Sequence, residues 1–289
     1  MPLHRLHEPD EPLVAPAIVA AFDGWIDAGG ASTAAAEQIA RDAEPIVTFT
    51  SDDLYDYRSR RPVLDIVDGT LTELTWPVLA IKRARAGGRD LLVLSGPEPD
   101  FRWRELGRDV LELAMRLGVV EWVSLGAIPA AVPHTRAVPI LATSSKPGLL
   151  HDDEQVGPQG LLRVPAAALS TIEHQITGGG IPAVGFYAQV PHYVGGSYPA
   201  ATIAILEHAG RHLGVEAPLG ELPNEALAQR ERLDTVVEAD DDSRTYVARL
   251  ETVVDNEELP TGDELVGEIE RFLQQRDGGG GPSGQGPLH

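Results

Sequence analysis

The residues best suited to chemistry lie in loops that follow apolar, strand-like runs. His134 and Arg136, two positions apart, would pair a proton shuttle with an anion clamp. Glu98, held between two prolines, would suit a general base or an acceptor for a ribose hydroxyl. Asp27 and His192 lie in two further loops of this kind. These five candidate catalytic side chains come from four loops, which could converge at one edge of a sheet.

Ligand binding without chemistry is a second possibility for the same loops. The segment 22–30 is rich in glycine, which allows close backbone approach, and the helix expected after it offers free N–H groups that suit an anion. The candidate ligand-binding residues are Gly24, Trp25, Gly29 and, in the last loop, Tyr193.

Each of these features also has a purely structural interpretation. Segment 22–30 can be an ordinary turn over which Trp25 packs. The Glu98 carboxylate can cap the helix that begins near Trp103. Likewise, the histidine and arginine of the third loop, 126–136, can hydrogen-bond loop carbonyls and hold that loop closed.

Several chemistries are excluded by residue content. The chain contains no cysteine, so it has no disulfide, no thiolate nucleophile, no cysteine-ligated zinc and no iron–sulfur cluster. The glycine-rich segment 22–30 fits neither the P-loop nor the GxGxxG fingerprint, and the sequence contains no GxSxG elbow and no HxH or HExxH spacing. We therefore expect no metal and no cofactor.

The charge of the chain restricts its partners. Lysine and arginine number 23 against 44 aspartates and glutamates, a net charge of −21. Such a surface repels phosphate backbones and anionic lipids, so we expect neither a nucleic-acid nor a membrane partner. Because cysteine is absent and the opening residues lack the basic-then-apolar order of a secretory signal, we expect a cytoplasmic protein.

The elements that must position these loops alternate between strand and helix. Apolar runs predict strands at 17–22, 46–50, 63–67, 71–76, 78–81, 91–94, 119–128 and 181–187, and helices at 28–39, 103–117, 165–177 and 200–213. Asp68-Gly69 between two of the strands is a hairpin signal. This order favours an α/β core over residues 1–215, with a mostly parallel sheet between two layers of helices.

Beyond residue 215 the composition changes. Residues 216–277 hold 18 acidic and 6 basic side chains, and apolar residues recur at helical spacing in 246–254 and 265–273. With a helix starting at Asn224, this predicts a separate acidic appendage of three helices. Residues 278–289 are dominated by glycine, proline, serine and glutamine, which predicts a disordered tail.

Four motifs, in this order, resemble the proteasome assembly chaperone family in its actinobacterial branch, over about residues 15–215. They are Phe22 to Gly30, Ser95 to Asp100 with Trp103, Pro129 to Arg136, and Val190 to Tyr193 followed by Tyr198-Pro199. The resemblance implies a three-layer α/β/α fold similar to nucleoside phosphorylases, with the helical appendage of the bacterial branch. It also implies a homo-oligomer, for which a trimer is the first expectation.

Two functions follow from these observations. The family's eukaryotic and archaeal members bind proteasome subunits without catalysis, so the leading hypothesis is a non-catalytic, chaperone-like protein that binds other subunits. The alternative is an enzyme of phosphorylase or hydrolase type that acts on a nucleoside-like molecule through the loops after the strands. The first hypothesis makes the five candidate side chains structural, whereas the second requires them to share one open pocket.

Overall fold

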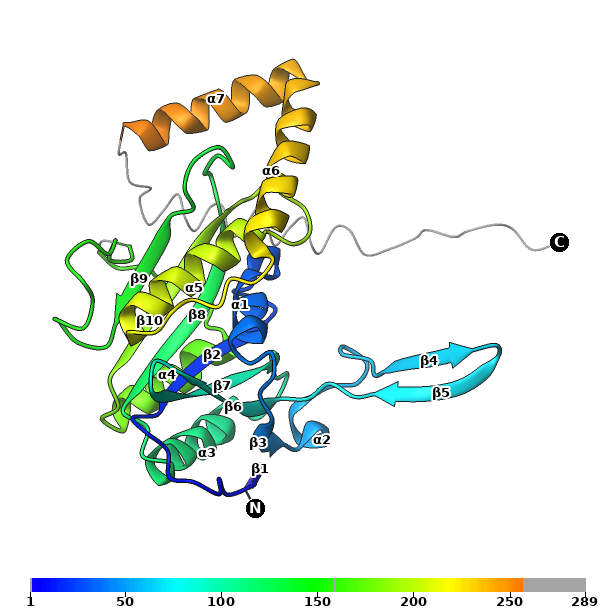
Figure 1. Cartoon of the computed structure of the whole chain (residues 1–289), viewed down its shortest axis with the longest axis vertical. Coiled ribbons are helices and arrows are strands. Elements are labelled where there is room, and N and C mark those ends of the chain that lie inside the picture. Colours follow the sequence, from blue (N-terminus) through cyan, green and yellow to red (C-terminus); the bar gives the residue numbers. More distant parts are fainter. Residues whose placement is uncertain (1, 159, 257–289) are drawn as a thin grey trace.

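A single eight-stranded sheet organises the protein in the computed structural model, which describes residues 2–158 and 160–256 (Figure 1). Its strand order is β1-β3-β6-β7-β2-β8-β10-β9. The strands are β1 (His4–Leu6), β2 (Ala17–Asp23), β3 (Pro45–Phe49), β6 (Ala80–Ala86), β7 (Arg89–Pro97), β8 (Glu121–Ala130), β9 (Ile140–Ser144) and β10 (Ala183–Pro191). A separate hairpin consists of β4 (Val63–Val67) and β5 (Thr70–Thr75).

The parallel part of the sheet is its centre. Strands β7, β2, β8 and β10 are parallel neighbours, whereas the outer strands β1, β3, β6 and β9 pair antiparallel. Leu91 to Leu94 are all buried, as the continuous apolar run predicts for a strand covered on both faces. The fold is therefore mixed α/β, with the expected parallel pairing confined to the four central strands.

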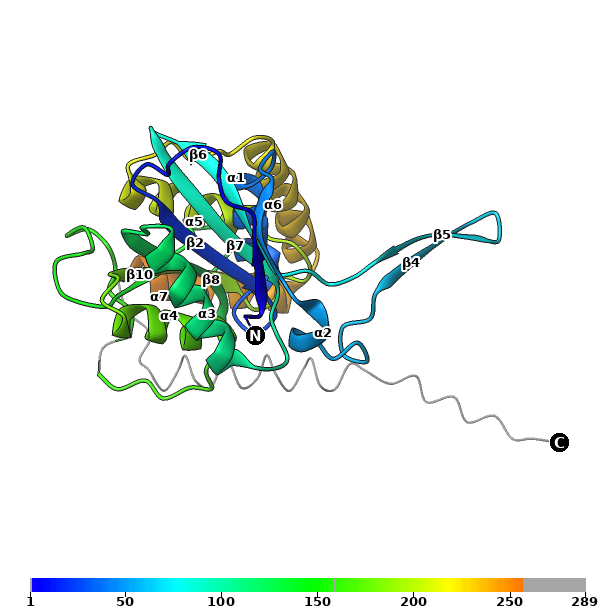
Figure 2. The same cartoon turned by 90° about the horizontal axis from the view of Figure 1, so that it is seen from below.

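Helices cover both faces of the sheet (Figures 1 and 2). They are α1 (Ala31–Ile39), which follows the short 3₁₀ turn η1 (Ala28–Gly30), α2 (Ser51–Leu54), α3 (Trp103–Arg116), α4 (Ala168–Gly178) and α5 (Pro199–Leu213). Successive side chains of β2 take opposite sides: Ile18 belongs to the cluster with α3 and α4, and Val19 to the cluster with α1 and α5. The two apolar clusters are the two cores of a three-layer arrangement.

The predicted strands and helices of the core are present, with shifts of a few residues at their ends. Strands β1 and β9 lie at the two edges of the sheet and are not among the strands predicted from the sequence. Strand β1 has three residues and β9 has five, so both are at the short end of the range of strand lengths and give a short sequence signal. The pairing that creates β9 comes from its neighbour β10.

Two helices follow the core. These are α6 (Leu222–Glu238) and α7 (Asp241–Asp255), and the Asp240 side chain caps α7 by accepting from the backbone N–H of Ser243. Figure 1 shows α6 rising beyond the end of α5 and α7 folding back above the loops at that end of the sheet. The third predicted helix, at 265–273, and the predicted tail, 278–289, lie outside the described residues.

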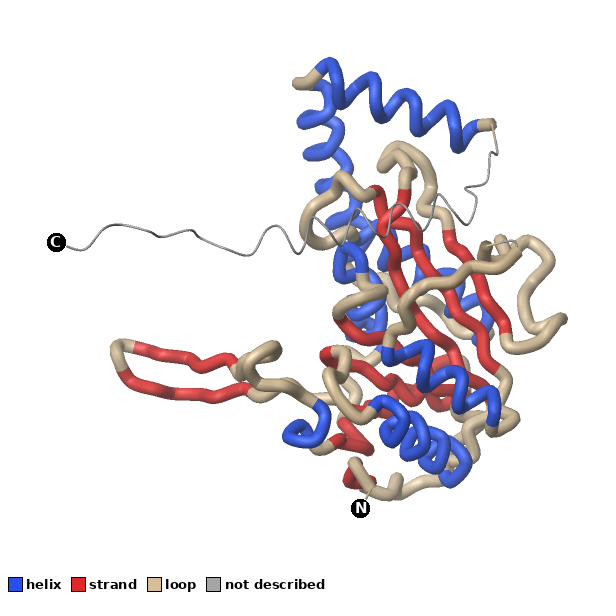
Figure 3. The backbone as a smooth tube through the Cα atoms, turned by 180° about the vertical axis from the view of Figure 1, so that it is seen from behind, coloured by secondary structure: helices blue, strands red, loops and turns tan. Residues whose placement is uncertain are grey.

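The hairpin β4–β5 extends away from the rest of the molecule as an arm (Figures 1 and 3). Its turn is Asp68-Gly69, and both residues have positive φ, 50° and 77°, as a two-residue hairpin turn requires. The predicted hairpin is thus confirmed. Every residue of both strands is exposed, which the sequence does not predict.

None of the helices in the described ranges has both the length and the apolar character needed to cross a bilayer.

Candidate functional site

The loops that follow β8 and β10 meet at the carboxyl end of the sheet. The Tyr193 hydroxyl accepts from the backbone N–H of His134 at 2.8 Å and lies 2.7 Å from Nδ1 of the same histidine. The His192 backbone N–H donates to the Ala130 carbonyl at 3.1 Å. The loop 126–136, with His134 and Arg136, and the loop 189–194, with His192 and Tyr193, are therefore one structural unit.

Helices α6 and α7 contact this unit through polar side chains, which we call the loop–helix cluster. Its members from the loops are His134, Arg136, His192 and Tyr193, and its members from the helices are Arg230, Asp234, Tyr246, Glu251 and Asp255.

Arg136 makes the most extensive of these contacts. Its Nε and Nη2 donate to the two carboxylate oxygens of Asp255 at 2.8 and 2.7 Å, and its Nη1 donates to Glu251 at 3.1 Å. This forked arrangement holds the pKa of the Asp255 carboxyl below its ordinary range. Since two carboxylates of α7 already occupy the guanidinium, it has little capacity left to clamp an anionic substrate.

His134 is almost wholly buried and bridges a loop to α6. Its Nε2 lies 3.1 Å from Asp234 Oδ1, and Arg230 donates both to Asp234 and to the His134 carbonyl oxygen. Burial, partly offset by the hydrogen bond to Asp234, lowers the pKa of His134. The partners fix the tautomer of the neutral ring, because Asp234 can only accept from Nε2 and the Tyr193 hydroxyl then donates to Nδ1.

His192 completes the cluster from the last loop. Its Nε2 lies 3.2 Å from the Tyr246 hydroxyl of α7, and its Nδ1 lies 3.2 Å from the Ala130 carbonyl. The rings of His192, Tyr193 and Tyr246 meet edge to face. Three of the five candidate catalytic side chains are thus brought together, and each contacts a helix of the appendage.

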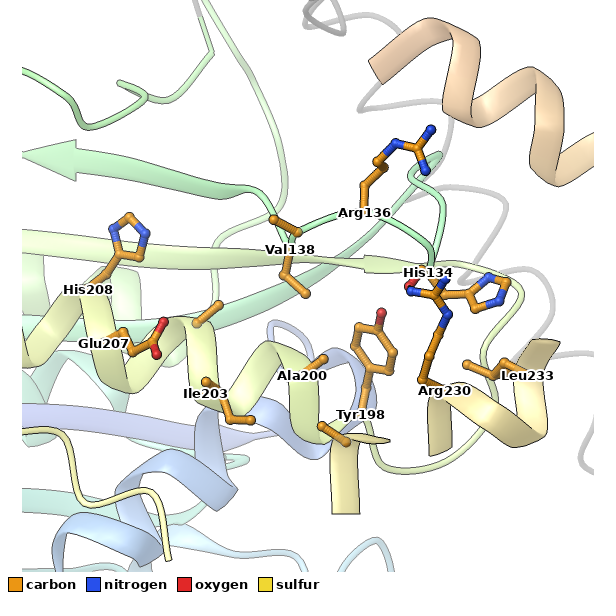
Figure 4. A pocket seen from close by; sticks show the side chains of 13 residues that line it. His134, Arg136, Val138, Tyr198, Ala200, Ile203, Glu207, His208, Arg230 and Leu233 are labelled. Atoms are coloured by element: carbon orange, nitrogen blue, oxygen red, sulfur yellow. The ribbon is translucent and has the colours of Figure 1, made fainter. Parts of the chain in front are cut away.

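A pocket of about 450 Å³ opens beside the cluster, between α5, α6 and the loop 131–139 that joins β8 to β9 (Figure 4). His134, Arg136 and Arg230 line it together with Tyr198, Glu207 and His208. The Tyr198 ring points into the pocket (Figure 4). Burial raises the pKa of Tyr198 to about 12, so the hydroxyl stays protonated at neutral pH.

Asp27 and Glu98 lie elsewhere and bind helix starts. Asp27 accepts from the backbone and hydroxyl groups of Ser32 and Thr33, so both its oxygens cap the first turn of α1. Glu98 accepts from the backbone N–H of Ala168 at 2.7 Å, at the start of α4. The structure therefore gives Glu98 a capping contact with α4, and not with the helix beginning at Trp103. Burial raises the pKa of Glu98.

The candidate ligand-binding residues also separate. A Cβ on Gly24 would lie 3.1 Å from the Glu98 carboxylate. Gly29 has a φ of 64°, and a Cβ there would lie 2.8 Å from the Tyr198 Cβ, so this glycine permits the first loop to touch the start of α5. Trp25 lines a different cavity, described below, and Tyr193 belongs to the loop–helix cluster.

Sequence reasoning missed the residues of α6 and α7 that complete the cluster. Arg230 and Asp234 are four positions apart on one helix and form an ion pair, a spacing that is visible in the sequence. Nothing in the sequence, however, says which loop they contact. In the part of the chain that the structure describes, no group of three or more histidine, aspartate or glutamate side chains is placed to hold a metal ion.

Comparison with known proteins defines the family. Residues 21–237 match the PAC2 family. The chain belongs to the PAC2 family. Among solved structures, it is similar to a Mycobacterium tuberculosis protein of unknown function, with 33% identity, a TM-score of 0.84, and coverage of 95% of this chain and 96% of that one. A search of curated proteins found no match.

Other PAC2-like structures carry names that refer to the proteasome. A proteasome-assembly chaperone homologue from Mycobacterium tuberculosis is 37% identical, with a TM-score of 0.73 and coverage of 80% of this chain and 99% of that one. A Pyrococcus furiosus proteasome activator has a TM-score of 0.63 over 82% of this chain and 99% of that one. At 15% identity the archaeal protein shares the fold alone. The homologues place this chain in a chaperone-like family.

Proposed function

We propose that this PAC2 protein is a non-catalytic, protein-binding protein with a chaperone-like role, and that it works as a homo-oligomer. The β4–β5 arm is its main protein-binding element. The mixed α/β core, for which we retain the nucleoside-phosphorylase-like description as part of the proposal, serves as a scaffold. In this account the loop–helix cluster holds the appendage in place, and its histidines and arginine transfer no proton.

The observation that carries the proposal is the side-chain pattern of the arm. Cross-strand partners share a face, and Leu64 pairs with Leu74 while Ile66 pairs with Leu71, so these four side chains form one apolar face. The register irregularity between Asp65 and Ile66 keeps the second pair on the same side as the first. Ile66 and Leu71 are 61% and 66% exposed.

The opposite face of the arm is polar or mixed. It carries the pairs Val63–Thr75, Asp65–Glu73 and Val67–Thr70. This is the pattern of a sheet that buries one face, yet nothing in the described chain covers the apolar one. An isolated two-stranded hairpin is marginally stable in water, so the arm needs a covering partner. Another copy of the chain is present whenever the protein is, and its own arm offers a matching apolar face.

The candidate catalytic groups support the same conclusion. Asp27 and Glu98 bind helix starts, and His134, Arg136 and His192 bind α6, α7 or neighbouring loop atoms. A general base must reach the proton that it abstracts, and these hydrogen bonds direct the side chains toward the scaffold. We assign these side chains to the architecture of the scaffold.

The self-association part of the proposal is tested by sedimentation equilibrium of the full chain. Wild type is expected to associate. The double variant Ile66→Ser/Leu71→Ser should associate at least about a hundredfold more weakly, because two large side chains lose roughly 3 kcal/mol of burial. The matched control is Val63→Ser/Val67→Ser, on the other face of the same hairpin, which should associate like wild type. A monomeric wild type, or two variants that behave alike, would overturn this part.

The chaperone-like part is tested with purified proteasome α subunits. Immobilised wild-type protein should retain them at moderate salt, and the loop–helix variant His134→Leu, whose arm is intact, should retain them equally. Failure of wild type to retain any subunit would remove the proteasome from the proposal and leave self-association standing on its own test.

A further inference from the structure

A second cavity, of about 200 Å³, lies at the carboxyl end of the sheet on the face covered by α4. It is lined by residues that follow β2, by the end of β8, by β9 and β10, by the start of α4 and by residues within 157–158 and 162–167. None of the described residues that line it carries a charge. It is separate from the loop–helix cluster, and no residue lines both pockets.

The floor of this cavity is the ring of Tyr187, laid flat on the sheet. A Cβ on Gly126, its neighbour on β8, would lie 2.3 Å from one edge of the ring, and a Cβ on Gly185 would lie 2.7 Å from the other edge. Glycine inside a strand costs stability, and here two of them clear the space under one aromatic ring. The face of the ring turned away from the sheet is left to the cavity.

A connected network of hydrogen bonds fixes the hydroxyl end of the Tyr187 ring. The Tyr187 hydroxyl is hydrogen-bonded to the side chains of Thr143 and Ser124. Ser124 donates to Glu173 of α4 at 2.5 Å and accepts from the indole N–H of Trp122 at 2.7 Å. Burial raises the pKa of Glu173. Such a network fixes the orientation of the Tyr187 ring, because each side chain in it is hydrogen-bonded to at least one other.

Two polar side chains belong to this region of the fold. Ser170, on the first turn of α4, lines the cavity and is an exposed residue. Gln189 is not one of the lining residues, but it lies two residues after Tyr187 on the same face of β10, and its side-chain oxygen is buried with no hydrogen-bond partner in the described chain. Trp25 and the prolines 129, 158 and 165 supply rigid walls.

We propose that this cavity binds a neutral, planar molecule of one or two aromatic or heteroaromatic rings, stacked on Tyr187 and hydrogen-bonded at one edge. The volume sets the size, because a cavity of about 150 Å³ holds benzene and drug-sized pockets begin near 300 Å³. The flat aromatic floor favours a planar ring over a globular one. The absence of charged lining residues favours a neutral ligand. The proposal is independent of the arm and of self-association.

The test uses indole and phenol as probes, with cyclohexanol as a non-planar probe of similar size. Binding to the full-length protein is measured by saturation-transfer NMR and calorimetry. The blocking variant is Val164→Trp, whose side chain lines the cavity, and the matched control is Leu161→Trp, three residues away on the same segment and 85% exposed.

The proposal predicts that at least one aromatic probe binds wild type with a dissociation constant of about 1 mM or tighter, and at least about tenfold more tightly than cyclohexanol. Val164→Trp should weaken that binding at least about tenfold, and Leu161→Trp should leave it unchanged. Three results would each overturn the proposal: no measurable binding of either aromatic probe, equal binding of cyclohexanol, or equal effects of the two tryptophan variants.

Discussion

The arm and the loop–helix cluster use their side chains in opposite ways. The cluster gathers residues that are suited to catalysis, and the appendage occupies most of their polar atoms. The arm gathers residues that normally build a core, and the described chain leaves them exposed. Residue types that are common in catalytic sites therefore need not be the residues that carry the function of a protein. The exposed apolar face of β4–β5 is the surface that we propose for protein binding in this PAC2 protein.

The largest expected effect comes from removing the arm. Replacing residues 63–75 by a short glycine-serine turn should abolish self-association while the melting temperature of the dilute protein stays within about 2 °C of wild type, because no arm side chain packs in the core. Sedimentation and calorimetry on the same samples measure both quantities. A large fall in melting temperature at low protein concentration would show that the arm contributes to the stability of the fold and is not a separate binding element.

The next largest effect concerns the buried histidine of the cluster. His134→Leu should lower the free energy of unfolding by about 2–4 kcal/mol, because it removes two side-chain hydrogen bonds and leaves the Tyr193 hydroxyl and Asp234 each with one buried hydrogen bond fewer. Denaturant titration measures this change. The control is His174→Leu on exposed α4 surface, which should change stability by less than about 0.5 kcal/mol. Equal losses in both variants would contradict the structural role of His134.

The pH dependence of the free energy of unfolding tests whether His134 is held neutral in the cluster. The pKa of His134 is lower in the folded protein than in the unfolded chain, so the unfolded state binds more protons as pH falls below about 6.5. This group therefore destabilises the fold progressively from about pH 7 downward until the folded-state pKa is passed. Unfolding of wild type should become easier between pH 7.5 and 5.5 by more than that of His134→Leu. Parallel pH profiles would show that the imidazole is not held neutral.

Salt should affect the two regions in opposite directions. The pairs that Arg136 makes with Asp255 and Glu251 are partly exposed and are screened by added salt, whereas apolar contacts are not. Raising sodium chloride from about 0.05 to 1 M should increase amide exchange in α7 and leave self-association unchanged or stronger. Hydrogen-exchange mass spectrometry and sedimentation report on the two regions separately. Dissociation of the oligomer by salt would indicate a polar interface in place of an apolar one.

The smallest expected effect is at the turn of the arm. Gly69 has a φ of 77°, so Gly69→Ala should strain the turn by about 1 kcal/mol. Since the arm is not packed on the core, the global melting temperature should move by less than about 1 °C while amide exchange in β4 and β5 accelerates. A global shift of several degrees would show that the arm and core unfold together.

Much of this architecture is predictable from the sequence because it is encoded locally. The run Leu91 to Leu94 predicts a strand buried on both faces, and Asp68-Gly69 predicts a hairpin, because each depends on residues next to one another. What the sequence does not predict is long-range contact. The pairing of Arg136 with Asp255, 119 positions apart, depends on how α7 folds back over the sheet, as does the pairing of His192 with Tyr246.

The same reasoning explains why the arm and the second cavity escape prediction. Ile66 and Leu71 look like ordinary core residues in sequence, and only the tertiary structure leaves them outside. In the sequence, Tyr187 is an ordinary aromatic residue of a predicted strand. The orientation of its ring depends on Gly126 of β8 and Gly185 of β10. The local sequence pattern predicts the secondary structure of these residues. What each side chain contacts depends on how the helices and strands pack together.

The most direct test of the central claim follows the apolar face of the arm during association. Because the chain contains no cysteine, Leu71→Cys and Val67→Cys each provide a unique attachment point for an environment-sensitive fluorophore, on opposite faces of the hairpin. As protein concentration rises, the probe at position 71 should shift to the blue as it becomes buried, while the probe at position 67 should change little. If neither probe responds while the protein associates, or if both respond equally, the apolar face of the arm is not the binding surface.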